Sequence, residues 1–207
     1  MEILTNRQIS FLKLFAQNED LLKNFYLTDR FSEDLDFFSE HEVDPLSIDV
    51  FLQSIKKHLG FTSIDSQTKM NRNLFSLHCE DEVLKTEFTY FPFPRIKKGS
   101  SHYGVTTDDI FDIAVNKLFS IYQRSVQRDY IDLYMICKKE HYTISDLIKS
   151  AKIKFDWHID PLQLANQFLK SQEATDPPRL IIGLKRTSWL LFFKNEALKL
   201  KGDIVGK

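Results

Sequence analysis

The sequence predicts an α+β fold in which a small α/β half is followed by a helical half. Short strand-like runs occur before residue 95, whereas the chain beyond residue 108 is almost entirely helical in pattern. Between them, residues 95–103 combine Lys97, Lys98 and Gly99 with two serines, which is typical of a loop. We therefore expect two domains, residues 1–104 and 105–207.

The first half should contain two helices and several strands. Residues 6–25 space their apolar side chains for one helix face, and residues 25–28 are typical of a short buried strand. Asp44 and Pro45 favour a helix start and Gly60 a helix end, because Asp caps, Pro fits the first turn and Gly suits the C-terminus. Residues 74–79 and 83–90 then predict two strands joined by an acidic turn.

The second half should be a set of helices. Asp160 and Pro161 repeat the cap-and-proline start seen at residue 44. The expected helices are residues 108–123, 129–138, 145–153, 161–170 and 188–200.

Composition limits the class of protein. A chain of 207 residues with 43% hydrophobic residues can bury a core as one domain or two small ones. A formal net charge of −1 provides no global positive field for nucleic acid. Cys79 and Cys137 are too few for a disulfide framework and lack zinc-ligand spacing. With no apolar run of transmembrane length and no secretory signal, we expect a soluble, cytoplasmic protein.

The acidic run at residues 32–38 is the first candidate site. Strand side chains alternate, so Asp34 and Asp36 should lie on one face and Leu35 on the other. Two carboxylates about 7 Å apart along a strand can share a divalent cation such as Mg²⁺. The alternative is an exposed edge strand with solvated carboxylates. Glu87 is the natural third member from a neighbouring strand, although alone it would be expected to pair with Lys85.

Lys117 is the second candidate, because it falls inside the apolar stripe of a predicted helix. An ammonium there must reach water or meet an anion, since burying an unpaired charge is costly. Arg124 lies two turns further along the same face. Asp129 could be the N-cap of the next helix, or it could form an ion pair that orients Lys117. The stripe itself consists of Ile110, Ile113, Ala114, Leu118 and Ile121.

Taken in order, these segments resemble the AbiEii/AbiGii-type nucleotidyltransferase toxin family, part of the DNA polymerase β-like superfamily. The resemblance spans about residues 6–170 and is most specific in Asp112-Ile113-Ala114-Val115-Asn116-Lys117-Leu118. Its other segments are residues 25–28, 32–38, 84–94, Arg124 and 128–134. It implies a mixed-sheet nucleotidyltransferase core with a helical C-terminal domain.

The resemblance also implies the chemistry. Asp34 and Asp36 would hold Mg²⁺, and Glu87 would be the third acidic residue. Lys117 would supply positive charge to a nucleoside triphosphate, and Asp129 would position it or contact the nucleotide. Further nucleotide contacts would come from Thr28, Arg124 and Arg128. The acceptor would be RNA (tRNA in some members) or protein, and a cognate antitoxin would restrain the toxin in a bacterial abortive-infection or toxin–antitoxin system.

One family feature is absent from the sequence. Members usually follow the first strand with a Gly-Gly-Thr/Ser turn and a helix, which offer backbone N–H groups to phosphate. Here Thr28 is followed directly by Asp29-Arg30-Phe31-Ser32, and the first glycine is Gly60. Either the segment is missing from this version of the chain, or this is a degenerate member that acts as a partner- or RNA-binding module.

Overall fold

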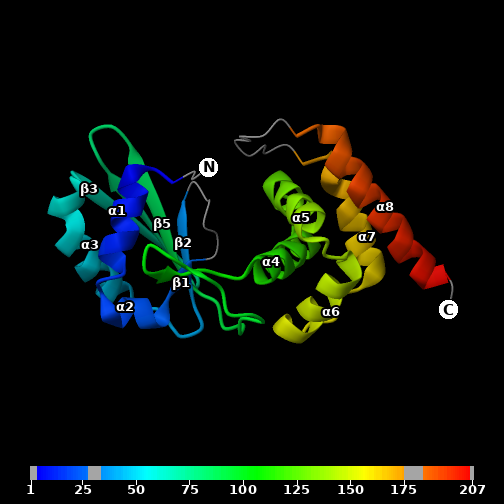
Figure 1. Ribbon diagram of the computed structural model, residues 1–207, viewed down its shortest axis with the longest axis horizontal. Coiled ribbons are helices and arrows are strands. Elements are labelled where there is room, and N and C mark those ends of the chain that lie inside the picture. Colours follow the sequence, from blue (N-terminus) through cyan, green and yellow to red (C-terminus); the bar gives the residue numbers. More distant parts are fainter. Residues whose placement is uncertain (1–3, 28–33, 175–183, 206–207) are drawn as a thin grey trace. The chain divides into compact units, whose positions relative to one another are not determined.

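The computed structural model describes residues 4–27, 34–174 and 184–205. The chain divides into two compact units, Met1–Asp109 and Ile110–Lys207 (Figure 1). The first unit contains the sheet and the second contains only helices among its described elements. The α+β fold expected from the sequence is confirmed, and the division falls five residues beyond the predicted boundary at residue 104.

A five-stranded mixed sheet forms the centre of the first unit. Its strand order is β1-β2-β5-β4-β3, with β2 and β5 parallel and the other neighbours antiparallel. The strands are β1 (Tyr26–Leu27), β2 (Leu35–Ser39), β3 (Ser63–Lys69), β4 (Arg72–His78) and β5 (Val83–Tyr90).

One strand, β3, was not predicted from the sequence. All but one of its residues are exposed, so it lacks the apolar alternation that marks a half-buried strand. It forms because β4 pairs with it along its whole length. A further small hairpin pairs β6 (Ser101–His102), inside the segment expected to be a loop, with β7 (Val105–Thr106), which follows that segment.

The first predicted helix is in fact two helices. α1 (Asn6–Phe15) ends well before residue 25, and α2 (Glu19–Asn24) begins afresh after Asn18. The side chain of Asn18 accepts a hydrogen bond from the backbone N–H of Leu21, which caps α2. The apolar spacing continues across the break, which is why periodicity alone did not reveal it.

The helix α3 (Pro45–Leu59) matches the prediction closely. Asp44 accepts hydrogen bonds from the backbone of Leu46 and Ser47 at its start. Gly60 follows its end with φ 71°, a left-handed conformation that glycine adopts without steric cost. The local sequence therefore defines both ends of this helix.

Helices α1 and α3 cover one face of the sheet (Figure 1). Phe11 and Phe15 of α1 meet Phe37 of β2 on this face, and Phe37 stacks on Phe88 of β5 with ring centroids 4.9 Å apart. Aromatic packing of this kind fixes which side of β2 is buried. The face away from α1 and α3 is consequently the one that can present polar side chains.

The second unit consists of the expected helices. They are α4 (Ile110–Gln123), α5 (Gln127–Glu140), α6 (Ile144–Phe155), α7 (Pro161–Leu169) with the short 3₁₀ helix η1 (Lys170–Gln172), and α8 (Arg186–Val205). Within its core, Phe193 of α8 packs on Tyr130 and Phe168. Across the described ranges, we find no helix that combines the length and apolar character needed to cross a membrane.

Candidate functional site

The strand β2 separates its apolar and acidic side chains as the sequence predicted. Leu35 and Phe37 are fully buried against the core, whereas Asp36 and Phe38 are half-buried. Asp34 immediately precedes the strand and is also half-buried. The alternation therefore directs Asp36 to the face opposite α1 and α3.

Glu87 lies beside Asp36 across the parallel β2–β5 pairing. The register joins Asp36 to Glu87 and Phe37 to Phe88, so each pair shares a face of the sheet. This is the neighbouring-strand position that the sequence analysis expected for a third carboxylate. Two carboxylates side by side repel each other unless a positive charge compensates them.

Arg72 of β4 supplies that positive charge, and the sequence analysis missed it. Its Nε lies 2.6 Å from Glu87 Oε1, and a terminal guanidinium nitrogen binds Glu87 Oε2, so the contact is a two-pronged ion pair. The hydrogen bonds that Arg72 donates to Glu87 raise the pKa of Arg72, and the charges of Glu87 and Asp36 act in the same direction. The sequence offered Lys85 as a partner for Glu87 taken alone, whereas the structure pairs Glu87 with Arg72.

The acidic residues offer oxygen ligands for a divalent cation. Mg²⁺ is commonly bound by one or two carboxylates together with substrate phosphates and water, and Asp34 and Asp36 fit that donor set. Within the described ranges, no three side chains of the His, Cys, Asp or Glu type are grouped as metal ligands. Because both oxygens of Glu87 receive hydrogen bonds from Arg72, Glu87 is not an open ligand in this arrangement.

Lys117 of α4 is bound by two carboxylates of α5. Its Nζ lies 2.6 Å from Asp132 Oδ2 and 3.1 Å from Asp129 Oδ1, so the ion pair with Asp129 that the sequence suggested is present. Burial lowers the pKa of Lys117, but the charges of Asp132 and Asp129 outweigh it and raise the pKa above its ordinary value. The Lys117 side chain keeps 22% of its surface exposed, so the ammonium is held without being sealed off.

Asp129 is nearly buried, with 4% of its side chain exposed. It is not the N-cap of α5, because the helix begins at Gln127 and its N-cap residue is Val126. Arg124 approaches Asp129 Oδ2 at 3.4 Å and is more than half exposed. Asp129 therefore links two cations, which favours the positioning role over the capping role.

Of the two remaining predicted nucleotide contacts, the structure describes Arg128 but not Thr28. Arg128 is exposed on the first turn of α5. Thr28, together with the rest of the segment where a glycine turn would be expected, lies outside the described residues.

A second aspartate–lysine pair was missed altogether. Lys154 Nζ of α6 lies 2.7 Å from Asp112 Oδ1 of α4, and both side chains are fully buried. A sequence signal existed, since Lys154 continues the buried stripe of Leu147 and Ala151 at helical spacing. Like Lys117, Lys154 is a lysine in an apolar stripe, which indicates that its ammonium needs an anionic partner.

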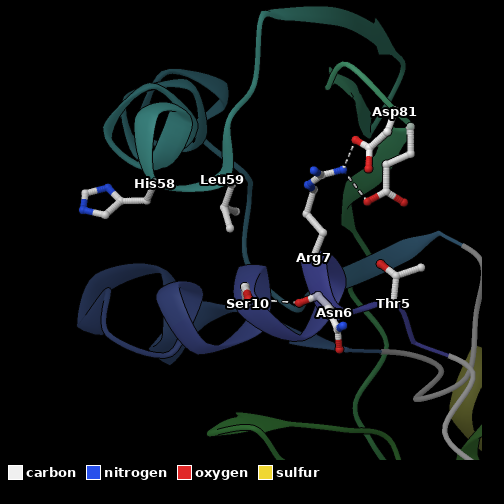
Figure 2. A pocket seen from close by; sticks show the side chains of 8 residues that line it. Thr5, Asn6, Arg7, Ser10, His58, Leu59 and Asp81 are labelled. Atoms are coloured by element: carbon white, nitrogen blue, oxygen red, sulfur yellow. Dashed lines mark hydrogen bonds and ion pairs between the residues drawn. The ribbon is translucent and has the colours of Figure 1, made fainter.

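Elsewhere on the first unit, a surface hollow of about 380 Å³ opens beside α1. Figure 2 shows Arg7 reaching across it to Asp81, at 2.8 Å, and the same guanidinium also binds Glu82. None of the acidic strand residues lines this hollow, and Arg7 is already neutralised there. Its lining residues are Thr5, Asn6, Arg7, Ser10, His58, Leu59, Asp81 and Glu82.

Two comparisons with known proteins agree with this geometry. Residues 21–195 match the family model described as "Nucleotidyl transferase AbiEii toxin, Type IV TA system". A crystal structure of a candidate nucleotidyltransferase from H. pylori is 20% identical, with a TM-score of 0.56 and 98% of each chain covered. The structure of JHP933 from Helicobacter pylori is also 20% identical, with a TM-score of 0.56, covering 97% of this chain and 91% of that one.

At this level of identity, the likeness to the two H. pylori structures shows the shared fold alone. A comparison with curated proteins gave no match. The family match, however, covers most of the sequence and includes β2, β5, Lys117 and Asp129. The chain belongs to the AbiEii family of nucleotidyltransferase toxins of type IV toxin–antitoxin systems.

Proposed function

We propose that this chain transfers a nucleotide from a nucleoside triphosphate to an RNA or protein acceptor, with Mg²⁺ bound by Asp34 and Asp36. The observation that carries the proposal is the position of Asp36, which β2 directs to the sheet face opposite the two helices, in register with Glu87. The aromatic core fixes that orientation, because a one-residue slip would bury Asp36 and expose Phe37.

Mg²⁺ at Asp34 and Asp36 would neutralise phosphate charge and lower the pKa of an attacking hydroxyl. Asp36 is suited to hold a cation because it is half-buried and lies on a rigid central strand. Asp34 contributes a second carboxylate next to the strand's first residue. The two side chains provide oxygen donors without histidine or cysteine, which matches the preference of Mg²⁺.

Lys117 is proposed to bind the triphosphate. Asp129 and Asp132 hold its ammonium in one orientation, so little side-chain freedom is lost when an anion binds. Arg124 and Arg128 add exposed positive charge at the start of α5, where phosphate oxygens could be bound. Thr28 remains a proposed nucleotide contact from the strand before the acidic run.

The family assignment implies a cognate antitoxin as a partner, and we propose that it restrains the transfer reaction in the cytoplasm. The competing function is a partner- or RNA-binding module without catalysis. It is favoured by the sequence after Thr28, which has no glycine before Gly60 and so lacks the usual phosphate-binding turn.

Calorimetric titration with each nucleoside triphosphate, with and without Mg²⁺, separates the two functions. We expect saturable binding that requires Mg²⁺ and is lost in Asp36→Ala. The matched control is Asp65→Ala, because Asp65 is an exposed aspartate on the edge strand β3 and pairs with His78. Equal binding by Asp36→Ala would contradict the metal role, and no binding by the native chain would favour the binding module.

A further inference from the structure

We propose that Arg72 is an internal counter-ion that withholds Glu87 from the divalent cation and thereby sets the affinity of the cation site. The inference rests on the proposed function, because it concerns the site formed by Asp34 and Asp36. It assigns a role to a residue on a strand that carries none of the acidic positions.

The contacts of Glu87 support this role. Arg72 binds both of its carboxylate oxygens, and the hydroxyl of Thr89 donates a further hydrogen bond to Oε1 at 2.5 Å. The Glu87 side chain is only 13% exposed, so little water reaches its carboxylate. A cation that recruited Glu87 would have to replace a two-pronged charged contact, which is among the stronger hydrogen-bonded pairs in proteins.

The strand register makes the arrangement persistent. β4 pairs with β5 so that Leu74 faces Glu87 and Arg72 faces Thr89, one pair further along the same sheet face. Arg72 therefore reaches Glu87 diagonally, a distance that a long side chain can span between neighbouring strands. Because β4 and β5 are both internal strands of the sheet, the guanidinium is anchored by a rigid backbone.

The charge of Arg72 also acts on Asp36. Asp36 lies beside Glu87 in the β2–β5 register, and Arg72 binds Glu87, so the guanidinium charge also acts on Asp36. Arg72 thus lowers the negative potential that would attract a cation, while it also relieves the repulsion between Asp36 and Glu87. The carboxylates of Asp34 and Asp36 are therefore proposed to bind the cation, while the carboxylate of Glu87 is bound by Arg72.

The test is calorimetric titration of the nucleotide-free protein with Mn²⁺ as the probe. We expect Arg72→Gln to bind Mn²⁺ at least about tenfold more tightly than the native chain, because a nearby unit charge is removed and the two-pronged contact that holds Glu87 is lost. Arg72→Lys keeps the charge but loses the two-pronged hydrogen bonding of the guanidinium. Its affinity for Mn²⁺ should therefore lie between those of the native chain and Arg72→Gln. In Arg72→Gln combined with Glu87→Gln, most of the gain should disappear.

Lys57→Gln is the matched control. Lys57 is an exposed lysine near the end of α3, which covers the other face of the sheet, so this variant changes the net charge equally without touching the pair. It should change the Mn²⁺ affinity less than about twofold, since exposed charges are screened.

The outcomes distinguish this inference from the proposed function. Tighter binding by Arg72→Gln that is abolished by Asp36→Ala supports both. Binding by the native chain that is lost in Asp36→Ala but unchanged or weaker in Arg72→Gln overturns the role of Arg72 and leaves the proposed function standing. Absence of Mn²⁺ binding in the native chain and in Arg72→Gln overturns both.

Discussion

The first turn and the middle of helix α4 use the same pair of residue types in different ways. Near its start, Asp112 binds Lys154 of α6 with both side chains fully buried. Five residues later, Lys117 binds Asp129 and Asp132 of α5 and keeps part of its surface exposed. The comparison separates a fully buried charge pair from a partly exposed one, whose lysine we propose binds an anion.

The two pairs differ in the free-energy cost of removing one partner and leaving the other charge without its counter-ion. A buried charge without its counter-ion loses both water and partner, whereas a partly exposed one can be solvated again. Lys117 also has two carboxylate partners, so losing one leaves the other. The first pair should therefore respond to mutation mainly in stability and the second mainly in ligand binding.

The largest effect should come from breaking the buried pair. Lys154→Ala removes the ammonium that lies 2.7 Å from the fully buried carboxylate of Asp112, so we expect a loss of about 3–5 kcal/mol in the free energy of unfolding. Urea denaturation followed by circular dichroism measures this. The control is Lys149→Ala, which removes an exposed lysine of the same helix that pairs with Asp146 and should cost less than about 0.5 kcal/mol.

A further variant sharpens this test. Replacing both residues, with Asp112→Leu and Lys154→Met together, should recover much of the lost stability, because no lone charge remains in the core. Native-like stability of Lys154→Ala alone would contradict a structural role for the pair.

The second effect concerns Lys117. Lys117→Ala should reduce nucleotide transfer by about 100-fold, because a preorganised cation for the triphosphate is removed. Its effect on unfolding should be smaller than that of Lys154→Ala, because Asp132 is more than a third exposed and Arg124 still approaches Asp129. Binding of the triphosphate and urea denaturation measure the two effects. A variant that lost stability as Lys154→Ala does but kept its nucleotide affinity would reverse the comparison.

The two carboxylates around Lys117 should not be equivalent. Asp129→Asn should weaken nucleotide affinity several-fold, because Asp129 is nearly buried and holds both Lys117 and Arg124. Asp132→Asn should have less than half of that effect on the free energy of binding, because Asp132 is more exposed. Titration of both variants with the same nucleotide checks the order, and a larger effect at Asp132 would show that the shorter contact is the one that matters.

The smallest effect is the pH dependence of the Lys117 contacts. A folded-state pKa above the ordinary 10.5 means that the ion pair contributes its full stability below that value. The contribution is lost as the pH rises through the folded-state pKa. The difference in unfolding free energy between the native chain and Lys117→Met should therefore be constant from about pH 7 to about pH 9 and narrow above it. A difference that grew with rising pH would contradict the direction of the pKa change.

The sequence predicted those parts of the molecule whose signals are local. Asp44, Pro45 and Gly60 bracket α3, and the alternation in β2 gave the orientation of Asp36. Lys117 was found because a lysine in an apolar stripe needs an anion, and Asp129 was close enough along the chain to be suggested.

What the sequence did not predict depends on pairing between distant segments. β3 is exposed at all but one of its residues and forms because β4 pairs with it. The partner of Glu87 is fifteen residues away and is determined by the β4–β5 register, which no local pattern reveals. Asp112 and Lys154 are separated by 42 residues, although the position of Lys154 in its helix signals that it needs a partner.

The most direct test of the proposed nucleotide transfer uses a radioactive nucleoside triphosphate and measures label in total bacterial RNA and protein in the presence of Mg²⁺. We expect incorporation of label by the native chain and by Asp65→Ala, and none by Asp36→Ala. Incorporation by Asp36→Ala at the native level, or none by the native chain with any nucleotide, would contradict it.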